Sequence, residues 1–318
     1  MRKQYKTSFG KLTRRFEANN NFIGEATMIL VFGASGTCGE AVTRALVKEG
    51  AKVRGFVRHE EKAAIASAAG ASEIVLGDLR NMESLEKALN GVTEVFYMAP
   101  RFVADEAFIG RMVIRMASRA GVQKFVFQSA LHSNVRILLH HEFKREVEEA
   151  LYESDLDFTI LQLSRLMHNI LPSWTKVLST SLYSEPFSAN APISDVDYED
   201  VAEAAALALT KPGYGRATFE LSCEGMLNRH QRVELMSDIL GNPIKSVDIS
   251  VEEWLAKAGI FDVYEREART RMFNYYDDFG FKGGNALVLR SILGREPSSY
   301  RAFIEKLAQS RPTRNQTD

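Results

Sequence analysis

The stretch from Met28 to Gly50 constrains the fold of this chain more than any other. It begins with an apolar run, residues 28–32, whose length and β-forming residues are typical of a buried strand. Three glycines follow at three-residue spacing: Gly33, Gly36 and Gly39. Apolar residues then recur at helical spacing up to Gly50, which is typical of the position just after a helix.

A strand, a glycine-rich turn and a helix in this order are typical of a loop that binds the phosphates of a dinucleotide. The first glycine permits a tight turn, the second lets backbone N–H groups approach an anion, and the third lets the helix pack closely. The N–H groups at the start of the helix then face the phosphates. We expect the loop to consist of Gly33, Ser35, Gly36, Thr37, Cys38 and Gly39. The alternative is a glycine-rich turn without a ligand.

Charge and cysteine content exclude several classes of protein. The net charge of the 318 residues is −1, so we expect neither nucleic acid nor an acidic membrane surface as a partner. No apolar run approaches the roughly 20 residues of a membrane-spanning helix. Cys38 and Cys223 cannot form a disulfide framework, and no Cys/His spacing indicates a metal site. We therefore expect a cytoplasmic protein without a metal.

The N-terminal segment, residues 1–27, differs from the rest in charge. Six Lys or Arg residues stand against two Glu residues, a net charge of +4. Three interpretations compete: a disordered basic tail, an organelle presequence, or an extension upstream of the functional start. The segment lacks both a secretory apolar region and a clear amphipathic Arg/Ser pattern. Because the first strand begins at Met28, we favour a dispensable, disordered tail.

Beyond Gly50, strands and helices alternate regularly. We expect strands at 52–57, 73–76, 94–98, 124–128 and 157–161, and helices at 59–69, 81–89, 105–120 and 139–153. This alternation predicts an α/β fold of the Rossmann type, a doubly wound parallel sheet with helices on both faces. The nucleotide then binds over the carboxyl ends of the strands. We assign residues 28–165 to this NAD(P)-binding domain.

The remainder, residues 166–318, reads as a smaller, mostly helical region that covers the nucleotide, supplies the substrate pocket and partly interleaves with the first domain. Residues 164–194 contain three prolines and read as irregular. We expect helices at 199–209, 231–240, 251–257, 261–276, 286–293 and 299–308, and strands at 217–222 and 246–249. Three aromatic residues line a substrate pocket or form a core: Trp174, Tyr183 and Phe187. Three arginines alternate with acidic residues as on a solvated helix face: Arg266, Arg269 and Arg271.

The end of the second strand distinguishes between cofactors. An NAD-preferring fold usually has a carboxylate there, which holds the ribose 2′-hydroxyl. This chain has Arg58, with Lys62 one helical turn further on. A guanidinium can bind a 2′-phosphate through two hydrogen bonds, so we predict NADP(H). Asp78, followed by Leu79 after the third strand, either contacts the adenine or forms a turn.

These features together resemble the NmrA-like family of atypical short-chain dehydrogenases/reductases. The resemblance includes the glycine loop, Arg58 and the turn Gly77-Asp78-Leu79. It continues in the segments FVFQSALHS (125–133), HHEFKREVEEALYESDLDFTILQLSRLMHN (140–169), DYEDVAEAA (197–205) and ATFEL (217–221). It covers about residues 28–305. It implies a Rossmann fold, and for some members a nucleotide-sensing regulatory role instead of catalysis.

An ordinary short-chain reductase has a Tyr four residues before a Lys on one helix face, where the ammonium lowers the pKa of the phenol. Here Lys144 is present, but His140 occupies the Tyr position. The resemblance assigns Lys144 to the nicotinamide ribose. Ser129, at the end of the fifth strand, stands where a substrate-orienting Ser would lie. His140 could donate a proton near neutral pH, or it could simply open the helix.

Two functions remain open. The first is an NADPH-dependent reductase of a small carbonyl or quinone-like substrate, with Ser129 orienting the substrate and His140 or water supplying the proton. The second is a non-catalytic NADP(H)-sensing regulator that acts through a protein partner. Cys38 lies at a helix start, where the thiolate is favoured electrostatically, but a small packing residue is the simpler interpretation.

Overall fold

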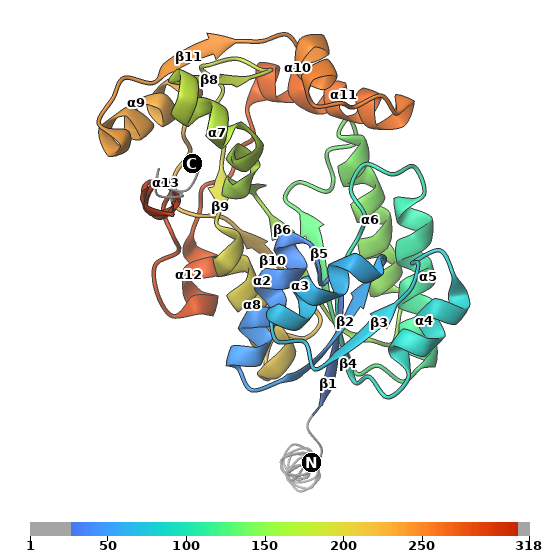
Figure 1. The fold of residues 1–318 in the computed structure, drawn as a ribbon. Coiled ribbons are helices and arrows are strands. Elements are labelled where there is room, and N and C mark those ends of the chain that lie inside the picture. The colour runs from blue at the N-terminus through green and yellow to red at the C-terminus, as the bar shows by residue number, and fades with distance from the viewer. Residues whose placement is uncertain (1–26, 311–318) are drawn as a thin grey trace, which may run out of the picture.

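The computed structural model describes residues 27–310, and a seven-stranded sheet forms its centre (Figure 1). The strands are β1 (Met28–Phe32), β2 (Lys52–Val57), β3 (Glu73–Leu76), β4 (Glu94–Met98), β5 (Lys124–Ala130), β6 (Asp157–Leu163) and β10 (Ala217–Leu221). They run in the order β10-β6-β5-β4-β1-β2-β3, and every neighbouring pair is parallel. The doubly wound Rossmann-type fold is therefore confirmed. Its strand order reverses between β1 and β4, which is where such sheets bind nucleotides.

Helices cover both faces of the sheet (Figure 1). One face carries α2 (Thr37–Lys48), α3 (Ala63–Ala68) and α8 (Tyr198–Thr210). The other carries α4 (Met82–Leu89), α5 (Glu106–Arg119) and α6 (Leu139–Tyr152). Strand β1 shows the division, because Ile29 and Val31 enter the first core and Leu30 and Phe32 enter the second. Burial on both faces explains why these strands read as continuous apolar runs.

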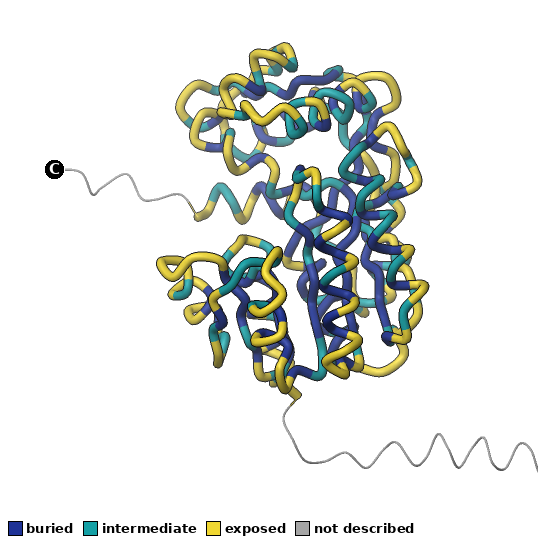
Figure 2. The backbone as a smooth tube through the Cα atoms, turned by 90° about the vertical axis from the view of Figure 1, so that its right-hand side faces the viewer, coloured by how far each residue is buried: buried dark blue, intermediate teal, exposed yellow. Residues whose placement is uncertain are grey.

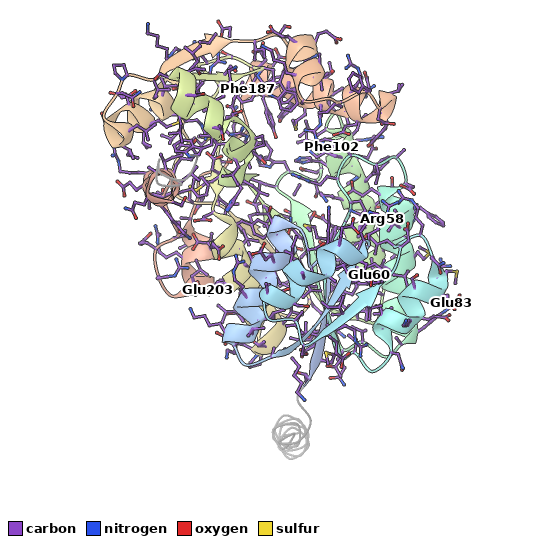
Figure 3. The ribbon with its side chains drawn as sticks, viewed as in Figure 1. Arg58, Glu60, Glu83, Phe102, Phe187 and Glu203 are labelled. Atoms are coloured by element: carbon purple, nitrogen blue, oxygen red, sulfur yellow. The ribbon has the colours of Figure 1, made fainter. Side chains whose placement is uncertain are left out.

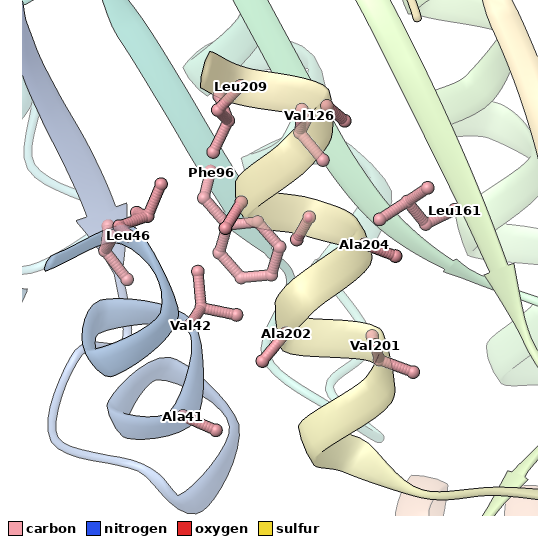
Figure 4. Packing of buried hydrophobic residues seen from close by; sticks show 14 of the residues in the cluster. Ala41, Val42, Leu46, Phe96, Val126, Leu161, Val201, Ala202, Ala204 and Leu209 are labelled. Carbon is pink, nitrogen blue, oxygen red and sulfur yellow. The ribbon is translucent and has the colours of Figure 1, made fainter. Parts of the chain in front are cut away.

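Helix α8 lies against both α2 and the sheet because its inner face is built from small side chains. Ala202 and Ala204 of α8 belong to the same buried cluster as Val42 of α2 and Phe96 of β4 (Figure 4). Both α8 and β10 come from the chain beyond residue 165, yet they complete the main sheet and one of its faces. The carboxyl ends of the strands are therefore surrounded by elements from both halves of the sequence.

Most of the remaining elements form a region above the carboxyl ends of the strands, called the upper region below (Figure 1). They are β7 (Arg165–Leu166), the 3-10 turn η2 (Met167–Ile170), α7 (Leu171–Thr180), β8 (Leu182–Glu185), β9 (Asp195–Val196), α9 (Arg229–Leu240), β11 (Lys245–Asp248), α10 (Val251–Lys257), α11 (Val263–Phe279) and α13 (Tyr300–Gln309). Helix α12 (Leu287–Leu293) instead packs beside the sheet against α8 and β10, and its Leu289 belongs to the first core. The prediction that residues 164–194 are irregular is wrong where α7 and β8 form. Pro172 does not prevent α7, because it occupies the first turn, where no intrahelical N–H is needed.

Two smaller cores hold this region together, and Figure 2 shows the buried segments running through it. Trp174 and Tyr183 belong to one core, and Phe187 packs with Phe273 and Tyr276 in the other. The core alternative is thus correct for the three aromatic residues. The basic segment predicted as a disordered tail lies outside the described residues, except for Thr27. Within residues 27–310, no helix has the length and apolar character needed to span a membrane.

Candidate functional site

The glycine loop joins β1 to α2, and its three glycines have different surroundings. Gly33 has a φ of +70°, which makes the tight turn and lets Gly36 N donate to Gly33 O over 2.9 Å. A Cβ on Gly39 would lie 2.2 Å from Gly33 O, so only glycine fits there. A Cβ on Gly36 would make only one ordinary contact, 3.5 Å from the same oxygen. The protein itself therefore leaves open the space beside Gly36, where a phosphate would approach.

Helix α2 begins directly at this loop without a side-chain cap. Its first intrahelical bond runs from Glu40 N to Gly36 O over 2.8 Å. The preceding N–H groups, those of Thr37, Cys38 and Gly39, have no partner within a helix by geometry. Together with the positive end of the helix dipole, they suit an anion such as a dinucleotide phosphate. Ser35 is half-buried in the turn before them.

Of the two interpretations of Cys38, its environment supports the packing residue and not the thiolate. Burial raises the pKa of its thiol, and this outweighs the opposing effects of a hydrogen bond with Tyr198 and of the Arg101 charge. Tyr198, buried at the start of α8, donates its hydroxyl proton to Gln128 of β5. Cys38 is therefore a protonated packing residue that connects the glycine loop to α8.

The ends of β2 and β3 bring the predicted adenosine-side residues together. Val57 pairs with Leu76, so Arg58 and Asp78 follow neighbouring strand ends, and Arg58 Nη2 lies 3.7 Å from Asp78 Oδ2. The Arg58 side chain is 65% exposed and follows the carboxyl end of β2 (Arg58 is labelled in Figure 3). Asp78 Oδ1 accepts a hydrogen bond from Arg80 N over 2.9 Å, which fixes the turn. Lys62 ends an exposed 3-10 turn, η1 (Glu60–Lys62), and Leu79 packs on the core below.

Ser129 lies at the end of β5 on the face that α6 covers. Its hydroxyl is buried and donates to Glu148 Oε1 of α6. Glu148 also accepts from Ser133 Oγ and Gln162 Nε2, each over 2.9 Å. Ser129 can therefore contact a substrate only through its lone pairs or after exchanging this hydrogen bond.

Lys144 is not a solvated helix charge, because it is only 8% exposed. Its ammonium lies 2.9 Å from Glu106 Oε1 and 5.8 Å from the centre of the Phe127 ring. Burial raises the pKa of Glu106, and the Lys144 charge opposes this rise. Glu106 is a site residue that sequence reasoning missed, since 38 residues separate it from its partner.

His140 is half-buried one helical turn before Lys144 on α6. Its ring centre lies 4.7 Å from that of Phe102 and 4.3 Å from that of His141. Burial, followed by the charges of its neighbours, holds the pKa of His140 well below its usual value. At neutral pH, His140 is therefore a neutral imidazole, which corrects the expectation of a proton donor with an unperturbed pKa.

The comparison with known proteins agrees with the fold described above. The model of the NmrA-like family matches residues 25–310. The chain belongs to the NmrA-like family. It is 30% identical over 230 residues to the NAD(P)H azoreductase of Xenophilus azovorans, covering 71% of this chain and 78% of that protein.

Solved structures share the NmrA-like fold at lower identity. An Escherichia coli NADPH-dependent quinone oxidoreductase, solved with NADPH, superimposes with a TM-score of 0.76 at 22% identity, covering 88% of this chain and 100% of the other. NmrA, a negative transcriptional regulator solved with NAD, gives a TM-score of 0.71 at 18% identity over 89% and 96% of the two chains. Both a reductase and a regulator are thus built on this fold.

In this NmrA-like chain, contacts between the Arg269 guanidinium and two aromatic rings connect α10 and α11 of the upper region to the loop after β4. Phe102, in the loop after β4, has a φ of +57°, and its ring lies 4.0 Å from the Arg269 guanidinium of α11 (Phe102 is labelled in Figure 3). The ring of Trp254 on α10 lies 5.7 Å from the same guanidinium. The prediction of a solvated Arg269 is therefore wrong. Its partners are distant in sequence, so no local pattern indicates these contacts.

Proposed function

We propose that this NmrA-like protein binds NADP(H) and reduces a small quinone-like acceptor. The observation that carries the cofactor assignment is the loop in which Gly39 is required by backbone packing while the space beside Gly36 stays open. The dinucleotide phosphates would bind the N–H groups at the start of α2. No group of three or more potential metal-ligating side chains is found in residues 27–310.

Arg58 supports NADP(H) over NAD(H). Its guanidinium is exposed and only loosely paired with Asp78, at 3.7 Å, so it can bind a 2′-phosphate without losing a strong ion pair. Lys62 adds a second exposed positive charge one turn further on. Asp78 and Leu79 would border the adenosine, and Lys144 would contact the nicotinamide ribose.

The nature of the acceptor follows from the groups that could supply a proton. NADPH, when bound, supplies a hydride. Reduction of a simple carbonyl then leaves a strongly basic alkoxide, which needs an acid beside it. Here the Tyr is absent and the pKa of His140 is lowered. A quinone-like acceptor spreads the negative charge over its ring, so water or the neutral His140 imidazole suffices. Ser129 would orient the acceptor oxygen.

Steady-state kinetics with NADPH and a panel of quinones and aldehydes tests this proposal. We expect NADPH oxidation with quinones and little with aldehydes. His140→Ala is expected to retain at least about a tenth of kcat with quinones, because a neutral imidazole contributes little as an acid. Faster turnover of aldehydes than of quinones would contradict the quinone-like assignment, and absence of NADPH binding would contradict the cofactor assignment.

A non-catalytic NADP(H)-sensing role, exerted through a protein partner, is the second candidate. It is favoured by the engagement of Ser129 with Glu148 and of Lys144 with Glu106, because both groups already have hydrogen-bond partners within the protein. Tight binding of NADPH and NADP⁺ without turnover of any acceptor would support the regulatory role. Turnover of any acceptor at a substantial rate would contradict it.

A further inference from the structure

Glu106 lies at the first position of α5 and is completely buried. One carboxylate oxygen, Oε1, accepts a hydrogen bond from Lys144 Nζ over 2.9 Å. The other oxygen, Oε2, has no hydrogen-bond partner among residues 27–310. The buried hydroxyl of Tyr97 on β4 is also unpartnered in the described part of the chain. Buried polar atoms are rarely left without a hydrogen-bond partner, so these two unpartnered oxygens require an explanation beyond packing.

The close approach of α5 and α6, side by side in Figure 1, makes the contact possible. A Cβ on Gly110 of α5 would lie 2.4 Å from Val147 Cγ2 of α6, so only glycine permits this packing. Glu106 stands one turn before Gly110 on α5, and Lys144 stands one turn before Val147 on α6. The glycine therefore brings the carboxylate and the ammonium within hydrogen-bond distance.

Lys144 has a second carboxylate on its own helix, Glu148, but does not pair with it. Three neutral groups donate hydrogen bonds to the Glu148 carboxylate: the hydroxyls of Ser129 and Ser133 and the amide of Gln162. Because these donors satisfy both carboxylate oxygens, the ammonium is directed towards Glu106. A buried ion pair usually adds little stability over well-packed apolar residues of similar size, so stability alone does not explain why these two positions carry charges.

We propose that Glu106 is a positioning residue for NADP(H) binding. Its carboxylate holds the Lys144 ammonium where Lys144 contacts the nicotinamide ribose. This inference rests on the proposed function, since it assigns a cofactor contact to Lys144. It places the group that orients this lysine on α5, in a family member whose helix α6 lacks the Tyr of ordinary short-chain reductases.

Glu106→Gln is the direct test, because it removes the charge but keeps the size and an acceptor oxygen. We expect NADPH to bind at least about tenfold more weakly, as is usual when a buried charge loses its hydrogen-bonded partner. Fluorescence titration of NADPH measures the dissociation constants of the variant and the wild type.

Asp195→Asn is the matched control, because Asp195 is a buried carboxylate paired with Arg232 in the upper region. We expect it to lower the melting temperature while leaving the dissociation constant of NADPH within about twofold. If Glu106→Gln behaves in the same way, with a lower melting temperature and unchanged NADPH binding, Glu106 has only a structural role and the proposal is overturned.

A measurement on the cofactor-free protein separates this inference from the cofactor assignment. Acetylation of Lys144 by acetic anhydride, followed by mass spectrometry, should be faster in Glu106→Gln than in the wild type or Asp195→Asn. Faster acetylation together with weaker NADPH binding supports the proposal. If the wild type binds no NADPH and acetylation is still faster in Glu106→Gln, the proposed cofactor and the binding role of Glu106 are overturned. The contact between Glu106 and Lys144 is confirmed in that case. Unchanged acetylation overturns the contact itself.

Discussion

At the level of single residues, Gly36 and Gly39 give opposite predictions although both belong to the same loop. Gly39→Ala places a Cβ 2.2 Å from the Gly33 carbonyl oxygen, so the backbone must move and we expect a loss of stability above about 3 kcal/mol. Gly36→Ala adds only a 3.5 Å contact at a φ of −87°, so the fold should tolerate it. We expect Gly36→Ala to weaken NADPH binding more than about tenfold because the methyl group occupies the phosphate space.

Denaturant unfolding and NADPH titration measure the two effects separately. The wild-type protein and Gly91→Ala are suitable references, because a Cβ on Gly91 meets no atom within 4 Å. Gly91 has a φ of +70°, so its substitution reports backbone strain without a clash. Wild-type NADPH affinity in Gly36→Ala would show that no phosphate approaches this residue.

Arg58 determines the expected preference for NADPH over NADH. We expect Arg58→Gln to weaken NADPH binding by about 10-fold to 100-fold and NADH binding by less than about twofold, because only NADPH carries the 2′-phosphate. Arg80→Gln is the control, since Arg80 is engaged with Asp105 over 2.7 Å at a neighbouring turn. Isothermal titration with both nucleotides provides the ratio. Equal weakening of the two would refute the 2′-phosphate contact.

At the level of elements, the packing of α5 against α6 depends on one glycine. Gly110→Ala should push α6 away, because its Cβ would lie 2.4 Å from Val147 Cγ2, and we expect a loss of about 1–3 kcal/mol. Val147→Ala makes room for this methyl group at the cost of a small cavity. We therefore expect the double variant to lose clearly less stability than the sum of the single variants, as measured by urea unfolding. Additive losses would show that the two residues do not compete for the same space.

The elements that the sequence predicts well are those with local signals. The bounds of β1, β2, β3 and β4 follow from short apolar runs between turn residues, and Asn81 caps α4 as expected. Residues that depend on distant partners were missed or misread. Glu106 contacts Lys144 only because α5 and α6 pack closely. Arg269 is partly shielded from solvent because Phe102 and Trp254 pack near its guanidinium.

The candidate site shows the same division. The glycine spacing indicates a dinucleotide-binding loop, and Arg58 indicates where the 2′-phosphate would bind. Both signals are local, since each follows from the position of a residue just after a strand. The protonation states of Cys38 and His140 could not be predicted in this way. They depend on how deeply the folded chain buries each group, and burial raises the pKa of Cys38 and lowers the pKa of His140.

At the level of the whole molecule, buried histidines make stability depend on pH. His141 is 2% exposed, its Nδ1 donates to the His132 carbonyl oxygen over 3.2 Å, and burial lowers its pKa to about 3. The unfolded chain binds this proton near pH 6.5. Because the unfolded state then carries more protons, this contribution is complete above about pH 6.5 and is lost as the pH falls towards about 3, by up to about 1.4 kcal/mol per pH unit.

His141→Asn should reduce this slope, since an amide can still donate to the His132 carbonyl but cannot titrate. Free energies of unfolding in urea at pH 7, 6 and 5 measure the effect. His230→Asn, at an exposed position of α9, is the control and should leave the slope unchanged. An unaltered slope in His141→Asn would show that other groups cause the acid sensitivity.

The position of β10 beside β6 has a consequence for the order in which the protein is made. While the ribosome adds residues 164–216, β6 has no neighbour on its outer side, and the alanine-rich α8 is not yet available to cover the sheet. A nascent chain at this stage exposes an unpaired strand edge and an apolar face, the two features that promote association with other chains. A gene fragment that ends near residue 165 therefore encodes an aggregation-prone intermediate, and a useful truncation has to extend beyond Leu221.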